Sequence, residues 1–169
     1  AIFIKRIMQT MDFLNHLLPT QGQRDTQNLF DVGPAIADIS PSVKSVGITG
    51  QMTGSRADVL IADDVEVPNN SGTQMQRDKL NEAVKEFDSI LKPNGRIIYL
   101  GTPQNEMSLY NELQTRGYSC MIWPALYPQD AKEREFYGDR LGRAIAEVYD
   151  ADPEKWEGKP TEPLRFNET

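Results

Sequence analysis

Adjacent acidic residues follow a short apolar run at residues 59–66, which read VLIADDVE. The four apolar residues predict a buried strand that delivers Asp63 and Asp64 to the end of a sheet. Carboxylates removed from water are costly unless a cation or strong hydrogen bonds compensate them. A divalent metal beside a nucleotide phosphate is the common reason for such a site, and a strand-end Asp helps to hold Mg²⁺ in nucleotide triphosphatases with a phosphate-binding loop.

The order of these acids suggests separate roles. Asp63 comes first after the apolar run and is the candidate metal ligand. Asp64 stands where many such enzymes have a Glu that orients the attacking water, and because Asp is one methylene shorter, Glu66 is an alternative for that task. The three acids could instead only cap a turn into the next helix.

A second apolar run lies at residues 96–104, RIIYLGTPQ, and also ends in a polar turn. Thr102 is the type of residue that senses a γ-phosphate from a neighbouring strand, and Gln104 is taken with it as a candidate nucleotide contact. Thr102 could equally satisfy the first turn before Pro103. Two such strands are what an open α/β sheet needs for a site at its carboxyl edge.

A cation and a missing motif complete the candidate chemistry. Arg56 precedes the acidic strand and could reach a phosphate as an arginine finger, which raises rates by orders of magnitude. A phosphate-binding loop needs Gly, four residues, then Gly-Lys-Ser/Thr. The single Gly-Lys pair, Gly158-Lys159, is followed by Pro160 and has Pro153 where the first Gly belongs. Either the protein hydrolyses no nucleotide, or the loop lies upstream of Ala1.

Composition narrows the class of protein. The chain has 169 residues, 38% hydrophobic and 25% charged, with a net charge of −7. One Cys and one His leave no disulfide framework or zinc site. No run approaches the ~18 apolar residues of a membrane span. The negative charge argues against gripping nucleic acid by bulk attraction, but not against a local basic strip.

Apolar periodicity predicts the elements that must position these residues. Helices are expected over residues 3–18, 78–91, 106–116 and 137–149. Strands are expected at residues 29–32, 43–49, 58–63, 96–101 and 118–123, with a tight loop at 50–55, a loop at 68–72 and a turn at 92–95. Strand, helix, strand, helix, strand is a parallel α/β pattern. Since the helix at 78–91 would be a right-handed crossover, the strands at 58–63 and 96–101 should be parallel neighbours.

Three blocks resemble a known family, the large terminase subunit of short-tailed podophages, also called DNA maturase B. The blocks are residues 43–66 (VKSVGITGQMTGSRADVLIADDVE), 98–104 (IYLGTPQ) and 121–128 (MIWPALYP). The resemblance runs from about Ile4 to Phe166. It implies an α/β fold that is part of a P-loop NTPase core (RecA/ASCE-like), with a mainly parallel sheet flanked by helices. Residues 1–163 would be the C-terminal part of the ATPase domain, and residues 164–169 the start of a linker to a nuclease domain outside the chain.

The resemblance also implies roles and partners. Asp63 would be the Walker-B metal acid, Asp64 the water-orienting carboxylate, Arg56 near the trans-acting arginine, and Thr102 within the coupling motif. ATP and Mg²⁺ are the implied cofactors. The implied partners are double-stranded DNA, the portal protein, the small terminase subunit and further copies in a ring, in the cytoplasm of an infected bacterial host and without a membrane. The fragment alone should bind ATP weakly and not turn it over.

Two other classes remain open at this point. One is a helicase-like or other motor ATPase, which a Gln-rich adenine motif upstream and a second RecA-like domain downstream would favour. The other is a non-enzymatic α/β interaction module. Both acids and Thr102 gathered on one edge of the sheet would disfavour that module.

Overall fold

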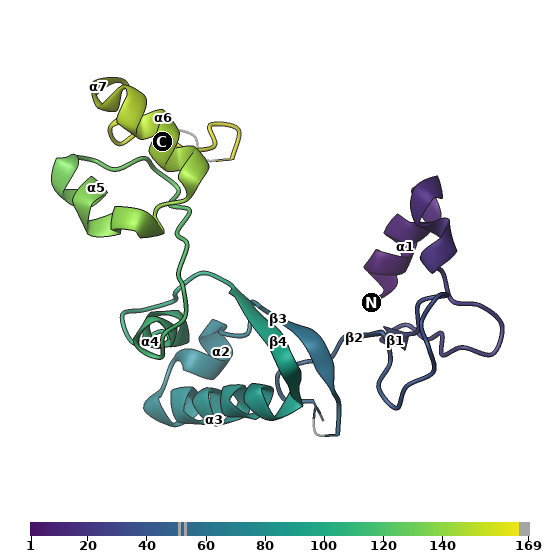
Figure 1. Cartoon of the computed structure of the whole chain (residues 1–169). Helices are drawn as coiled ribbons and strands as arrows, with labels where there is room; N and C mark the ends of the chain where they lie inside the picture. Colours follow the sequence, from purple (N-terminus) through teal and green to yellow (C-terminus); the bar gives the residue numbers. More distant parts are fainter. Residues whose placement is uncertain (51, 53, 166–169) are drawn as a thin grey trace. The chain divides into compact units, whose positions relative to one another are not determined.

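The computed structural model describes residues 1–50, 52 and 54–165 (Figure 1). The chain forms two compact units, Ala1–Glu112 and Leu113–Thr169. Among the described residues, no helix is both long enough and apolar enough to span a membrane.

The first unit begins with two short helical segments instead of the single helix expected over residues 3–18. Helix α1 spans Ile2–Thr10, and a 3-10 helix, η1, spans Asp12–Leu17. Met11 between them is extended, with φ −106° and ψ 103°. The apolar stripe therefore continues along the sequence, but the backbone interrupts it at Met11.

A small antiparallel pair of strands follows. Strand β1 is Leu29–Phe30 and strand β2 is Val43–Lys44, so both are shorter than the strands expected at residues 29–32 and 43–49. The tight loop expected at residues 50–55 includes positions 51 and 53, which lie outside the described residues.

The second sheet is the parallel pair that the sequence predicts, but its first strand is not buried as expected, because Val59 is 53% and Ile61 is 61% exposed. Strand β3 spans Ala57–Asp63 and strand β4 spans Leu91–Leu100, with Asp63 opposite Leu100. They are joined through α2, Pro68–Ser71, and α3, Gln74–Ile90. The expectation of parallel neighbours is confirmed, whereas residues 68–71 form a short helix and not the expected loop.

Helix α3 is defined by its cap and by one apolar face. Thr73 and Gln76 form a capping box, in which the Thr73 side chain accepts from the Gln76 N–H and Gln76 Oε1 accepts from the Thr73 N–H. Such a box satisfies two N–H groups that the first helical turn leaves free. The buried face packs on the sheet, where the Phe87 and Tyr99 rings are stacked with their centroids 6.0 Å apart. The buried residues of this face are Leu80, Val84, Phe87 and Ile90.

The Lys-Pro-Asn-Gly sequence at residues 92–95 lies within β4. It does not form the separate turn that was expected. The strand register shifts there, because Ala57 pairs with Leu91 while Val59 pairs with Arg96. Asn94 adopts a positive φ of 66°, which Asn tolerates better than most residues. The turn-forming residues therefore build a bulge.

The second unit is mainly helical. Its elements are α5 (Ala131–Tyr137), η2 (Gly138–Arg140), α6 (Arg143–Ala151) and α7 (Pro153–Trp156), while α4 (Leu109–Thr115) runs across the boundary between the units. Its core is built from Tyr127, Leu141, Ile145 and Tyr149.

Two expectations for the second unit are wrong. The helix expected over residues 137–149 is interrupted at Gly138, whose φ of 53° suits glycine and ends α5. The strand expected at 118–123 is absent from the described residues of that stretch, which hold one isolated bridge from Ile122 to Leu141. The alternating apolar residues of this stretch therefore belong to a loop and not to a strand of a sheet.

Candidate functional site

The two adjacent acids lie where the parallel strands end. Asp63 is the last residue of β3 and is exposed. Asp64 is also exposed, has a positive φ of 45°, and its N–H donates to the Leu100 carbonyl oxygen at 2.9 Å. The Asp64 backbone therefore closes the ladder between β3 and β4, while the residue remains exposed.

The residues after β4 reach the same edge. Thr102 and Gln104 are exposed, and Gln104 Nε2 donates to the Thr102 carbonyl oxygen at 3.1 Å. Since Thr102 follows Leu100 by two residues and Leu100 pairs with Asp63, Thr102 lies at the same end of the sheet as the acids. The expected clustering of Asp63, Asp64 and Thr102 at one edge is confirmed.

Glu66 differs from the other acids because it is buried, with 3% of its surface exposed. Its Oε2 accepts a hydrogen bond from Ser108 Oγ at 2.9 Å and another from the Leu109 N–H at 2.7 Å. Its Oε1 is buried and has no donor among the residues that the structure describes. The side chain therefore faces the start of α4.

Tyr110 closes the space beside the strand ends. Its hydroxyl donates to the Leu100 carbonyl oxygen at 3.2 Å. Burial raises the pKa of the Tyr110 phenol, the backbone N–H of Glu66 lowers it, and the negative charges of Asp64 and Glu66 raise it. The phenol is therefore a neutral donor at the carboxyl edge around neutral pH.

Arg56 lies at the opposite end of β3. It precedes the strand, so roughly 20 Å of extended chain separates it from Asp63. Its Nη1 donates to the carbonyl oxygens of Ser55 at 3.1 Å and Ser89 at 3.2 Å. Ser89 lies in the last turn of α3, where carbonyl groups lack helical partners. Within one chain, Arg56 supports the end of α3 and does not reach Asp63.

The acids at this edge could bind a metal ion only together with ligands from another molecule. Within the described ranges, no three His, Cys, Asp or Glu side chains form a group that could hold a metal. Mg²⁺ commonly takes one or two carboxylates together with substrate phosphates and waters. Asp63 and Asp64 therefore suit an ion that arrives with a nucleotide, and not a metal held by the protein alone.

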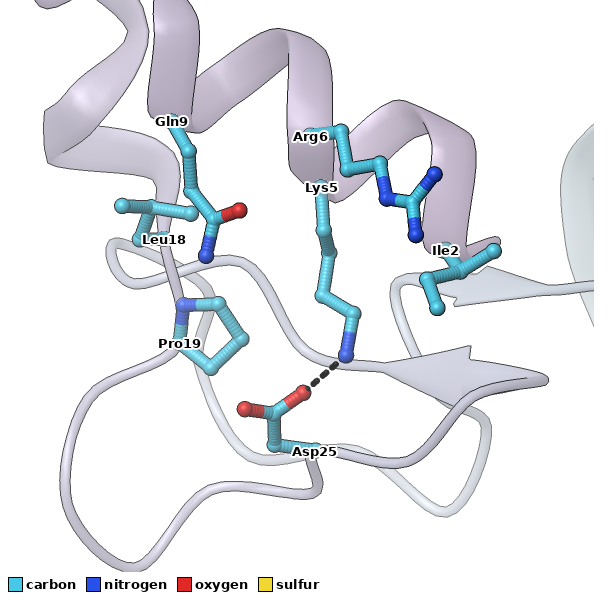
Figure 2. A pocket seen from close by; sticks show the side chains of 7 residues that line it. All are labelled: Ile2, Lys5, Arg6, Gln9, Leu18, Pro19 and Asp25. Carbon is cyan, nitrogen blue, oxygen red and sulfur yellow. Dashed lines mark hydrogen bonds and ion pairs between the residues drawn. The ribbon is translucent and has the colours of Figure 1, made fainter.

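A pocket in the N-terminal part of the first unit is lined by none of these residues (Figure 2). Lys5 points across it to Asp25, forming an ion pair, and also donates to the Thr26 carbonyl oxygen at 2.9 Å. This cation is already used to hold α1 to the loop before β1. The pocket is lined by Ile2, Lys5, Arg6, Gln9, Leu18, Pro19 and Asp25.

Sequence reasoning missed two residues at the carboxyl edge. Ser108 is fully buried and Tyr110 covers the end of β4. Ser108 precedes α4, so its residue type could have been recognised as a helix-start signal. Nothing in the local sequence marks Tyr110, because its partner Leu100 lies ten residues away.

The fold and this edge define an α/β protein with acidic and hydroxyl side chains gathered where two parallel strands end. No protein-family model matches the chain. The chain is 56% identical over 170 residues to a protein described as "Terminase, large subunit" from Enterobacteria phage T3. That alignment covers 99% of this chain and 29% of the phage protein. The resemblance to large terminase subunits is thereby confirmed, and the chain is homologous to a segment of such a subunit.

Proposed function

We propose that the chain is part of the ATP-hydrolysing motor that packages double-stranded viral DNA into a procapsid. The observation that carries this proposal is the carboxyl edge of the parallel pair, where Asp63 ends β3 and Thr102 follows β4. The relationship to a terminase large subunit supplies the biological setting. The complete subunit would use ATP with Mg²⁺.

Each residue at this edge has a role in the proposal. Asp63 holds Mg²⁺, Asp64 orients the attacking water, and Thr102 and Gln104 contact the nucleotide. When bound, Mg²⁺ would neutralise the charge that develops on the phosphate oxygens. Asp63 and Asp64 are exposed, so they are not removed from water as expected from the sequence, but both carboxylates are accessible to a ligand.

The uncovered sheet supports a larger P-loop NTPase core. Within the described residues, β3 and β4 pair only with each other, whereas parallel sheets are normally covered on both faces. One face of this pair exposes apolar side chains, with Ile61 61% and Val59 53% exposed. In the proposal, further strands and helices of a longer protein cover this face. Residues 1–163 are the C-terminal part of the ATPase domain, and residues 164–169 begin the linker to a nuclease.

The partners follow from the same setting. Double-stranded DNA would be the transported substrate, and the portal protein and the small terminase subunit would contact the motor. Several copies would form a ring in the host cytoplasm, with concatemer cleavage by the nuclease. A helicase-like motor ATPase shares the same edge chemistry, and its second RecA-like domain would distinguish it.

The proposal is tested by ATP hydrolysis in the complete subunit. Asp63→Asn should abolish turnover by weakening Mg²⁺ binding. Asp64→Asn should lower turnover by about 10²–10⁴-fold, the usual contribution of a positioned base, with little change in ATP affinity. Asp58→Asn is the matched control, because Asp58 lies on the same strand near its opposite end and should leave turnover unchanged. Full turnover in either edge variant would refute the proposal.

Arg56 requires a separate experiment, because a single chain keeps it far from Asp63. In an assembled ring, Arg56 would complete the site of the neighbouring copy. Mixing Arg56→Ala subunits with Asp63→Asn subunits should restore activity at interfaces where an intact Asp63 meets an intact Arg56. Absence of rescue at every mixing ratio would remove Arg56 from the site.

A further inference from the structure

Glu66 connects two segments that are far apart in the sequence. It belongs to the loop after β3, and both of its donors, Ser108 and Leu109, belong to the segment that follows β4. Ser108 is fully buried and Leu109 is 3% exposed, so water does not replace either contact. Hydrogen bonds to a carboxylate are stronger than bonds between neutral groups.

These contacts fix the far end of the segment that carries Thr102. Its near end is held at Leu100, which accepts the Asp64 N–H and the Tyr110 hydroxyl. Its far end is held by Glu66 at Ser108 and Leu109. Residues 101–107 therefore form a loop with both ends tied to the strand or loop that carries the acids.

The same geometry argues against Glu66 as the group that orients water. One carboxylate oxygen already accepts two hydrogen bonds, and the side chain is almost completely buried. Asp64, two residues earlier, is exposed at the end of the strand. A water aligned for attack must reach the carboxylate that orients it, and at 3% exposure Glu66 is far less accessible than Asp64, even though its Oε1 has no donor among the described residues.

We infer that Glu66 is a positioning residue, which holds the loop of Thr102 and Gln104 at a set place relative to Asp63 and Asp64. It acts through Ser108 and the start of α4 and touches neither nucleotide nor metal. The inference rests on the proposed ATPase function. It assigns the water-orienting role to Asp64 alone.

The test compares two replacements of Glu66 in the complete subunit. Glu66→Gln keeps an oxygen acceptor for Ser108 and Leu109, whereas Glu66→Ala keeps none. The alanine variant should lose about 10- to 100-fold in turnover, as expected when reacting groups are misplaced. The glutamine variant should lose only about threefold, because a neutral acceptor bonds less strongly than a charged one. Glu106→Gln, an exposed change in the same loop, should leave turnover unchanged.

The outcome that overturns the inference is a glutamine variant as inactive as Asp64→Asn, because only a role that needs the charge predicts it. Ser108→Ala provides a second check. It should lower turnover in the native background but add nothing to Glu66→Ala, since both changes break the same contact. Additive losses would also overturn the inference.

Hydrogen exchange separates this inference from the proposed function. The Leu109 amide donates to Glu66, so its exchange should accelerate at least about tenfold in Glu66→Ala and much less in Glu66→Gln. This measurement needs no ATPase activity. A complete subunit without ATPase activity would refute the proposed function and leave this contact measurable, whereas unchanged exchange at Leu109 in Glu66→Ala would refute the inference.

Discussion

Replacing Gly101 with Ala would show how closely the Tyr110 ring packs on the end of β4. A methyl carbon at this position would lie 2.0 Å from Tyr110 Oη and 2.3 Å from its Cζ, so the ring must move. Movement breaks the 3.2 Å hydrogen bond to the Leu100 carbonyl oxygen. Overpacking costs about 1–3 kcal/mol, and the lost bond about 0.5–1.5 kcal/mol. Because the phenol is half-buried and can swing outwards, we expect a total loss of about 1–3 kcal/mol.

A double-mutant cycle with Tyr110→Ala isolates this contact. Gly101→Ala should be destabilising when Tyr110 is present and close to neutral when the ring has been removed. The destabilisation caused by Gly101→Ala should be larger with Tyr110 present than in the Tyr110→Ala background by at least about 1 kcal/mol, which is within the usual range of coupling energies for residues in direct contact. Hydrogen exchange at the β4 amides reports the local free energy of opening. An equal effect of Gly101→Ala in both backgrounds would refute the packing argument.

Two further predictions concern the stability of the units. Phe87→Ala should destabilise the first unit by about 3–5 kcal/mol, because Phe87 is 2% exposed and stacks on Tyr99; denaturant unfolding should detect this, and a loss no greater than that of the exposed control Glu86→Ala would contradict it. In the second unit, hydrogen bonding to Arg134 lowers the pKa of Asp150 below its usual value. The stabilisation is therefore present above the ordinary carboxyl pKa and is lost as pH falls through the lowered value. Because Asp150 is half exposed, Asp150→Asn should cost less than about 1 kcal/mol at neutral pH, and acid-unfolding curves of the two proteins should converge at low pH; a constant gap would contradict the pairing.

The parallel pair could be predicted because three signals agree along the chain. The run ending at Asp63, the apolar face of α3 and the run ending at Leu100 each have the length and periodicity of their element. A crossover helix between two such strands leaves little choice of topology. The gathering of Asp63, Asp64 and Thr102 then follows from parallel strands alone.

The breaks in helices and strands could not be predicted in the same way. Periodicity continues through Met11 and Gly138, while backbone dihedrals at those residues end the helices. The Lys-Pro-Asn-Gly sequence at residues 92–95 has turn chemistry, and tertiary pairing uses it as a bulge inside β4. A local pattern reports a preference, and pairing partners decide how that preference is used.

The difference among the acids was also hidden from the sequence. Asp64 and Glu66 are two residues apart and chemically alike. Asp64 is nevertheless exposed, whereas Glu66 is buried with 3% of its surface exposed. Burial of Glu66 depends on Ser108, 42 residues further along the chain. Such a long-range contact leaves no trace in local spacing.

The uncovered face of the β3–β4 pair has a practical consequence for work with the isolated chain. Its exposed apolar residues sit beside strand edges that have no partner among the described residues. Edges of this kind are templates for pairing with another molecule, and large apolar patches promote aggregation. Copies of the isolated chain should therefore associate through this face as concentration rises. The substitution Ile61→Lys, at a residue that is 61% exposed, should improve solubility.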